Sequence, residues 1–140
     1  MQIFNNPVLL ETACGHNGNE KLLKKLTDIA IKSKGKLIKY QIFNLEERAL
    51  PITKEYKIFK PLCLNKNSWE KIIYYAKINK LFTFADVYGD YSFKLSHSCN
   101  IDGFKIHSED FFNTSSLKLT GQYSNISSLI LQLTKSQPLH

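Results

Sequence analysis

Cysteine is scarce in this sequence, with only three in 140 residues, at positions 14, 63 and 99. An odd number of widely separated cysteines with no C-x-x-C motif argues against a disulfide framework and against a structural zinc site. We therefore expect Cys14, Cys63 and Cys99 to be free thiols in a reducing compartment.

Long apolar runs are missing as well. None approaches the roughly 20 residues that a membrane-spanning helix needs. The first residues, MQIFNNPVLL, lack the basic stretch and the long apolar core of a secretory signal. Together with the free thiols, these absences predict a cytoplasmic protein that is not attached to a membrane.

Several motifs that would name a function are also absent. There is no G-x-G-x-x-G turn and no Walker A lysine motif, so nucleotide-binding folds lack support. The net charge of +7 comes from lysines spread along the whole chain, with no nucleic-acid-binding motif beside them. No H-x-H or H-x-x-x-H pair occurs, and a metal site usually needs three or more converging ligands. We therefore predict no metal ligand and do not expect nucleic acid as the partner.

What the sequence does have is enough apolar material for one domain over residues 1–140. Hydrophobic residues make up 43% of the chain and aromatic residues 12%, which argues against disorder. Strands are predicted within 7–15, over 37–43 and 81–87, and around 103–106. Helices are predicted over 19–35, with Asn17 or Asn19 as N-cap and Gly35 at the C-terminus, and over 68–80, with Ser68 as N-cap.

The remaining segments give weaker signals. Residues 44–66 are expected to be a long connection without a strong element, 91–99 a short helix at best, 114–123 a weak helix, and 127–133 a strand or a helical turn. Strands that alternate with helices, with connections too long for hairpins, predict an α/β fold of about four to five parallel βα units. A right-handed series of this kind forms either a doubly wound sheet or a closed barrel.

Residues 37–43, LIKYQIF, contain the most informative anomaly. Side chains in a strand alternate between faces, so Lys39 and Gln41 share one face while Ile38, Tyr40 and Ile42 share the other. A lysine inside a sheet is costly unless something pairs with it. The face that carries Lys39 is therefore either wet or holds an anion.

Other charged residues gather at the same end of the predicted sheet. In parallel α/β folds the chemistry collects at the carboxyl ends of the strands. Glu11 ends the first strand, Lys39 and Gln41 lie in the second, and Lys105 lies in the fourth, followed by residues 108–110. Two lysines in separate strands predict a site for a ligand with two or more negative charges. Each residue also has a plainer interpretation: a solvated lysine, a surface or cap glutamate, and a helix N-cap at 108–110.

These residues lie in motifs that resemble the sialic acid synthase (N-acetylneuraminate synthase) family. The family has a Glu at the end of its first strand, an N-H-N-G-type turn, and a V-K-F-Q-type strand, here Glu11, GHNG at 15–18 and IKYQ at 38–41. Residues 104–110, FKIHSED, followed by Asn113, resemble the family's Y-K-I-x-S-x-D/E stretch. The resemblance runs from about residue 7 to 118 and corresponds to the N-terminal half of the family's (β/α)8 barrel.

The resemblance implies an activity and roles for individual residues. The family condenses phosphoenolpyruvate with N-acetylmannosamine or a related sugar, using a divalent metal (Mn or Mg). Lys39 and Lys105 would hold the phosphate and carboxylate oxygens of phosphoenolpyruvate, with Ser108 as a further donor. Glu11 and Gln41 would face the sugar or the reacting carbons, and Asp110 would orient its neighbours.

The sequence also departs from the family. Asp86 and Val87 stand where the family has a Thr-Pro-like pair, and an acidic residue beside a phosphate pocket repels the ligand. An eight-stranded barrel needs roughly 250 residues, and residues 119–140 form a divergent tail. The family's metal ligands come from later strands. We therefore expect a partial TIM-type barrel that is inactive alone and that self-associates or pairs with a completing chain. The alternatives are a non-catalytic anion- or protein-binding half-barrel and a basic nucleic-acid-binding domain.

Overall fold

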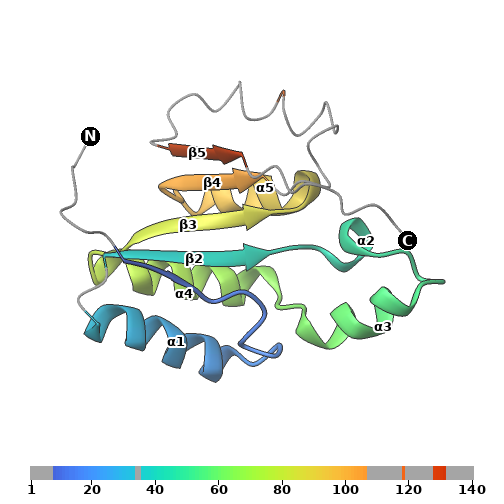
Figure 1. Ribbon diagram of the computed structural model, residues 1–140, viewed down its shortest axis with the longest axis horizontal. Coiled ribbons are helices and arrows are strands. Elements are labelled where there is room, and N and C mark those ends of the chain that lie inside the picture. The colour runs from blue at the N-terminus through green and yellow to red at the C-terminus, as the bar shows by residue number, and fades with distance from the viewer. Residues whose placement is uncertain (1–7, 34–35, 107–117, 119–127, 132–140) are drawn as a thin grey trace, which may run out of the picture.

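The computed structural model describes residues 8–33, 36–106, 118 and 128–131. Its elements alternate between strand and helix from β1 to β4, apart from the short helices between β2 and α4 (Figure 1). In chain order they are β1 (Leu9–Glu11), α1 (Glu20–Lys32), β2 (Leu37–Ile42), α2 (Leu45–Arg48), α3 (Lys54–Phe59), the 3-10 helix η1 (Lys60–Leu62), α4 (Lys66–Ile78), β3 (Phe82–Val87), α5 (Gly89–Ser98), β4 (Gly103–Ile106) and β5 (Ser128–Leu131).

The five strands form a single sheet in the order β1-β2-β3-β4-β5, and each strand pairs in parallel with the next. A doubly wound sheet reverses its strand order at a switch point, whereas a barrel adds its strands in sequence. The sequential order therefore selects the barrel type from the two parallel folds that the sequence allowed. It confirms the predicted α/β partial barrel of four to five parallel units, with 128–131 as a strand.

The apolar face of the sheet packs on the helices. Tyr40 in β2 is fully buried, shares a hydrogen bond of 3.0 Å with Thr27 of α1 and meets the Trp69 ring of α4 edge to face. Phe104 in β4 stacks on Phe93 of α5, with ring centroids 4.6 Å apart. Because neighbouring residues of a strand point to opposite faces, the residues between these apolar positions point away from the helices.

The predicted helix ends need two corrections. Helix α4 begins at Lys66 and its N-cap is Asn65, whose side chain accepts the Ser68 N–H; the prediction of Ser68 as the cap was wrong. The Ser68 hydroxyl instead donates to Asn65 and to Glu20 at the start of α1. Helix α1 has Asn19 as its N-cap, as predicted, but it ends at Lys32 with Ser33 as its C-cap; Gly35 lies outside the described residues.

Two segments are more ordered than the sequence predicted. Residues 44–66 contain α2 and α3, which are capped by the Asn44 and Thr53 side chains. Residues 89–98 form a helix of ten residues rather than a short one. The carboxylate of Glu47, in α2, accepts the Tyr91 N–H at 3.0 Å in the first turn of α5. A cap supplied from 44 residues away is invisible to local sequence patterns.

The predicted helix over 114–123 lies outside the described residues, apart from Lys118. Among the helices of the described residues, none is long and apolar enough to cross a membrane.

The turn between β1 and α1 contains a buried histidine. The side chain of His16 is fully buried, and its Nδ1 accepts the Gly18 N–H at 3.1 Å. Its Nε2 has no hydrogen-bond partner among the described residues and lies in a ring that meets Trp69 at 89°. Burial therefore lowers the pKa of His16, because the imidazolium would lose its hydration.

This buried histidine predicts a loss of stability in mild acid. The pKa of His16 is lower in the folded chain than the about 6.5 of an unfolded chain, so the unfolded state binds the proton more readily. The free energy of unfolding should therefore fall as the pH drops from about 7 toward 5.5. Urea unfolding at both pH values should show this fall, and His16→Asn, which keeps an acceptor for Gly18, should reduce it. An unchanged pH dependence in the variant would contradict the assignment.

Candidate ligand site on the polar face of the sheet

The face of the sheet that points away from the helices carries the charged residues. We call Glu11, Lys39, Gln41, Asp86 and Lys105 the polar face. Glu11 is in register with Lys39, and Gln41, Asp86 and Lys105 are in register with one another across β2, β3 and β4. Residues in register on parallel strands point to the same side. The polar face therefore consists of two adjoining rows, the second of them nearer the carboxyl ends of the strands.

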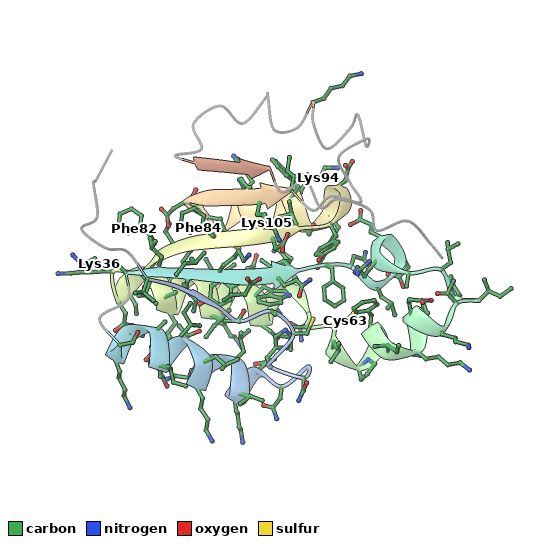
Figure 2. All side chains as sticks on the ribbon, in the orientation of Figure 1. Lys36, Cys63, Phe82, Phe84, Lys94 and Lys105 are labelled. Carbon is green, nitrogen blue, oxygen red and sulfur yellow. The ribbon has the colours of Figure 1, made fainter. Side chains whose placement is uncertain are left out.

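Apolar residues occupy the same face nearer the start of the strands. Phe82 and Phe84 precede Asp86 at two-residue spacing in β3, and Phe82 is in register with Leu37. In Figure 2, Phe82, Phe84 and Lys105 follow one another along the strand direction. The polarity of this face thus rises toward the carboxyl ends of the strands, which is the end where parallel α/β folds place their ligand sites.

Each lysine of the polar face is paired with a carboxylate. The Nζ of Lys39 lies 2.9 Å from Oε1 of Glu11, and their side chains are 9% and 49% exposed. The Nζ of Lys105 lies 2.7 Å from Oδ2 of Asp86, and these side chains are 11% and 4% exposed. The lysines are therefore not a pair of uncompensated cations, and the partner of Lys39 in this structure is a carboxylate of the chain itself. The sequence left open whether Lys39 faces water or an anion and favoured a bound ligand; in the structure the carboxylate of Glu11 is the anion beside it.

The amide of Gln41 is fixed by two residues that the sequence analysis did not single out for this site. The Cys14 thiol donates to Gln41 Oε1 at 3.3 Å, and Gln41 Nε2 donates to the Tyr88 hydroxyl. Burial raises the pKa of the Cys14 thiol, and the positive charge of Arg48 lowers that pKa by a smaller amount. The raised pKa favours the protonated thiol, which is the form that can donate this hydrogen bond. Cys14 and Tyr88 follow the ends of β1 and β3 closely, and that position is the signal that could have revealed them.

The structure brings together four of the six predicted site residues, Glu11, Lys39, Gln41 and Lys105. It adds Asp86, which the sequence analysis treated only as a departure from the family. Ser108 and Asp110 lie outside the described residues. Among the described residues, no three His, Cys, Asp or Glu side chains are placed to hold a metal ion.

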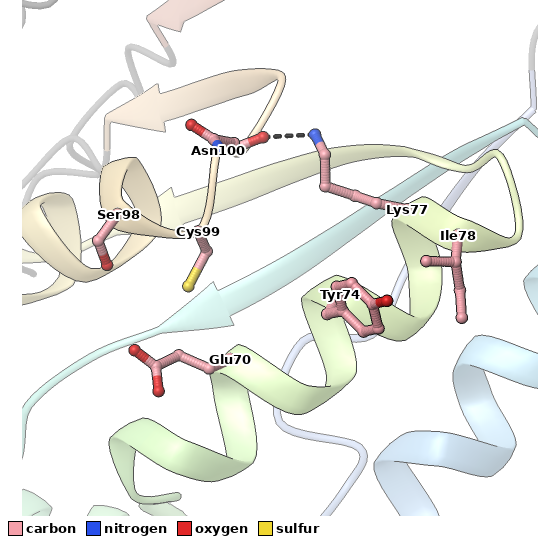
Figure 3. Close-up of a pocket in the computed structure, with 7 residues that line it drawn as sticks. All are labelled: Glu70, Tyr74, Lys77, Ile78, Ser98, Cys99 and Asn100. Carbon is pink, nitrogen blue, oxygen red and sulfur yellow. Dashed lines mark hydrogen bonds between the residues drawn. The ribbon is translucent and has the colours of Figure 1, made fainter.

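A separate cavity of about 560 Å³ opens between α4 and the end of α5 (Figure 3). It is lined by Glu70, Tyr74, Lys77, Ile78, Ser98, Cys99 and Asn100, and it includes none of the predicted site residues. In Figure 3, Lys77 reaches the backbone carbonyl of Asn100 across it, a contact that ties the end of α4 to the end of α5.

The sequence matches no family model and no curated protein. Solved structures do share its fold. The N-acetylneuraminic acid (sialic acid) synthetase of Leptospira borgpetersenii serovar Hardjo-bovis, in complex with citrate, aligns with a TM-score of 0.80 at 23% identity. That alignment covers 94% of this chain and 47% of the other. The chain therefore has the fold of about half of that synthetase.

Two further structures agree. The spore coat polysaccharide biosynthesis protein E (putative) of Chromobacterium violaceum ATCC 12472 aligns with a TM-score of 0.76 at 18% identity, over 92% of this chain and 41% of that one. The spore coat polysaccharide biosynthesis protein spsE of Bacillus subtilis aligns with a TM-score of 0.68 at 19% identity, over 89% and 36%. The chain thus spans less than half the length of each of these three structures. At these identities the likeness establishes the fold.

Proposed function

We propose that the chain is part of a synthase-type barrel of nonulosonic acid biosynthesis whose polar face binds a carboxylate-bearing substrate. The observation that supports this most directly is the placement of Lys39 and Lys105 on one face, toward the carboxyl ends of the strands, in a fold shared with a sialic acid synthetase. The substrates that the sequence resemblance implies are phosphoenolpyruvate and an N-acetylated amino sugar.

Lys39 is the residue that we assign to the substrate carboxylate. Its present partner, Glu11, lies at the end of the three-residue strand β1, and its side chain is about half exposed. An exposed carboxylate can leave an ion pair at little cost, because water solvates it again. An incoming carboxylate can therefore replace Glu11 at the Lys39 ammonium, while Gln41, held by Cys14 and Tyr88, presents a fixed amide beside it.

Condensation itself lies beyond the residues described here. The five strands supply part of an eight-stranded barrel. The divalent metal that the family resemblance implies finds no set of three ligands among the described residues, so no catalytic step is assigned through it. We accordingly expect these 140 residues alone to bind substrate without turning it over. The proposal includes a second chain, or further residues, that would supply the rest of the barrel.

Binding can be tested by thermal unfolding with phosphoenolpyruvate. A ligand that binds only the folded state stabilises it by about 2.7 kcal/mol at a hundredfold excess over its dissociation constant. We expect phosphoenolpyruvate to raise the melting temperature, sodium chloride at equal ionic strength to leave it unchanged, and Lys39→Met to abolish the shift. Lys25→Met, on the exposed face of α1, is the matched control and should keep it. An equal shift in both variants would assign the effect to the overall charge of the chain and overturn the proposal.

A further inference from the structure

A cavity of about 300 Å³ opens between α1 and α4, which lie side by side on the side of the sheet opposite the polar face (Figure 1). Its floor is apolar and is formed by Leu23 of α1 and Ile72 of α4, both of them buried. Its rim carries the exposed lysines Lys21, Lys24 and Lys71. A cavity of this volume with an apolar floor and a few charged groups is typical of a small-molecule site.

Hydrogen bonds between the two helices hold both ends of this cavity in place. The Ser68 hydroxyl, in the first turn of α4, donates to the carboxylate of Glu20, the first residue of α1. About two turns further along both helices, the Tyr75 hydroxyl donates to Asp28 Oδ1 at 2.8 Å. The two contacts fix the spacing of α1 and α4, so the cavity is already formed before any ligand arrives.

The rim of the cavity has an excess of positive charge. Lys24 is paired with Asp28, with its Nζ 3.0 Å from Oδ2. Among the described residues, no carboxylate forms an ion pair with Lys21 or Lys71. In that part of the chain, Glu20 is the one carboxylate that lines the cavity. Two unpaired ammonium groups against one carboxylate leave a net charge that a monoanion neutralises.

The charged rim and the apolar floor together define the class of ligand. Lysine stems are apolar and commonly cover apolar surface while the ammonium stays in water, so the stems extend the apolar walls up to the rim. The Tyr75 ring adds to one wall, with the Lys24 ammonium 4.2 Å from its centroid. Exposed ion pairs contribute little by themselves. An anion therefore gains appreciable affinity here only if it also has an apolar part that reaches the floor.

We propose that the cavity between α1 and α4 is a second ligand site, which binds an aliphatic monocarboxylate such as a short fatty acid. The alkyl chain lies over Leu23 and Ile72, and the carboxylate at the rim pairs with Lys21 and Lys71. None of these residues belongs to the polar face, so the inference is independent of the proposed function.

The experiment measures the binding of octanoate, acetate and octylammonium to the full chain by calorimetry at pH 7. We expect octanoate to bind about tenfold or more tightly than either of the others, because acetate lacks the alkyl chain and octylammonium has the wrong charge. Replacing Lys21 and Lys71 together by methionine should weaken octanoate binding by about tenfold. Both lysines are exposed, so the double variant should fold, which its melting temperature checks. Lys25→Met, exposed on α1 but not lining the cavity, is the matched control and should bind octanoate unchanged.

Several results would overturn the inference. Acetate that binds as tightly as octanoate would mean that the apolar floor is not used. Octylammonium that binds as tightly would mean that the lysines do not select the ligand, as expected of an apolar surface that docks another protein. An equal loss in Lys25→Met would assign binding to the overall charge of the chain. Octanoate binding that is lost in Lys39→Met would place the ligand on the polar face. The phosphoenolpyruvate test of the proposed function is unaffected by any of these results.

Discussion

Replacing Lys105 by methionine is expected to lower the free energy of unfolding by about 3–5 kcal/mol, the usual cost of removing one partner of a buried ion pair. The Lys105 and Asp86 side chains are 11% and 4% exposed, and their charged atoms are 2.7 Å apart. Methionine fills most of the volume of lysine but donates no hydrogen bond. Asp86 would then be a buried carboxylate whose Oδ2 has lost its donor and whose Oδ1 has none among the described residues. Urea unfolding at pH 7 measures the loss.

A double variant distinguishes this cause from a general disturbance of the sheet. Asp86→Leu combined with Lys105→Met removes both charges, and apolar pairs that replace buried ion pairs are often neutral or stabilising. The double variant should therefore recover most of the lost stability. The matched surface control is Lys66→Met, because Lys66 pairs with Glu70 at 3.6 Å with both side chains well exposed; its expected cost is below about 1 kcal/mol. A double variant no more stable than Lys105→Met would contradict the buried-charge explanation.

The second large effect is expected at Gly18, in the turn between β1 and α1. Gly18 has a φ of +69°, and a Cβ at this position would lie 2.0 Å from the backbone carbonyl oxygen of Pro61. The left-handed backbone alone costs an alanine roughly 1–2 kcal/mol. The overlap with a backbone atom must be relieved by separating the turn from η1. We expect Gly18→Ala to lose about 3–5 kcal/mol in total, within the range for severe single substitutions.

Asn17 provides the matched control for Gly18, since it is the preceding residue, is exposed and also has a positive φ, of 48°. Asn17→Ala should show only the backbone strain, roughly 1–2 kcal/mol. The difference between the two variants in urea unfolding isolates the contact with Pro61. Equal losses would mean that η1 moves aside freely and that this close approach does not hold the turn in place.

Much of the candidate site could be predicted because its signals are local. The parity of residues 37–43 places Lys39 and Gln41 on one face of β2, and this holds for whatever strands lie beside it. The spacing of apolar residues likewise predicts α1 and α4. The alternation of strands and helices predicts parallel pairing, and the motifs around Glu11, Lys39 and Lys105 resemble one family of barrels, whose fold the solved structures bear out.

The sequence left open which groups those side chains would meet. Asp86 and Lys105 are 19 residues apart and become partners only because β3 and β4 align in one register. Gln41 is fixed by Cys14 and Tyr88, which are 27 and 47 residues away. The choice of a barrel over a doubly wound sheet depends on strand order, which no single segment encodes.

By itself, then, the sequence determined that Lys39 and Gln41 lie on one face of β2, because side-chain direction follows from the two-residue period of a strand. Only the tertiary structure decided which carboxylate each lysine of the polar face pairs with. Pairing energies depend on distances of a few ångströms between side chains on different strands, and those distances are set by strand register and order. The result is one lysine with an exchangeable partner, Lys39, and one with a fixed partner, Lys105.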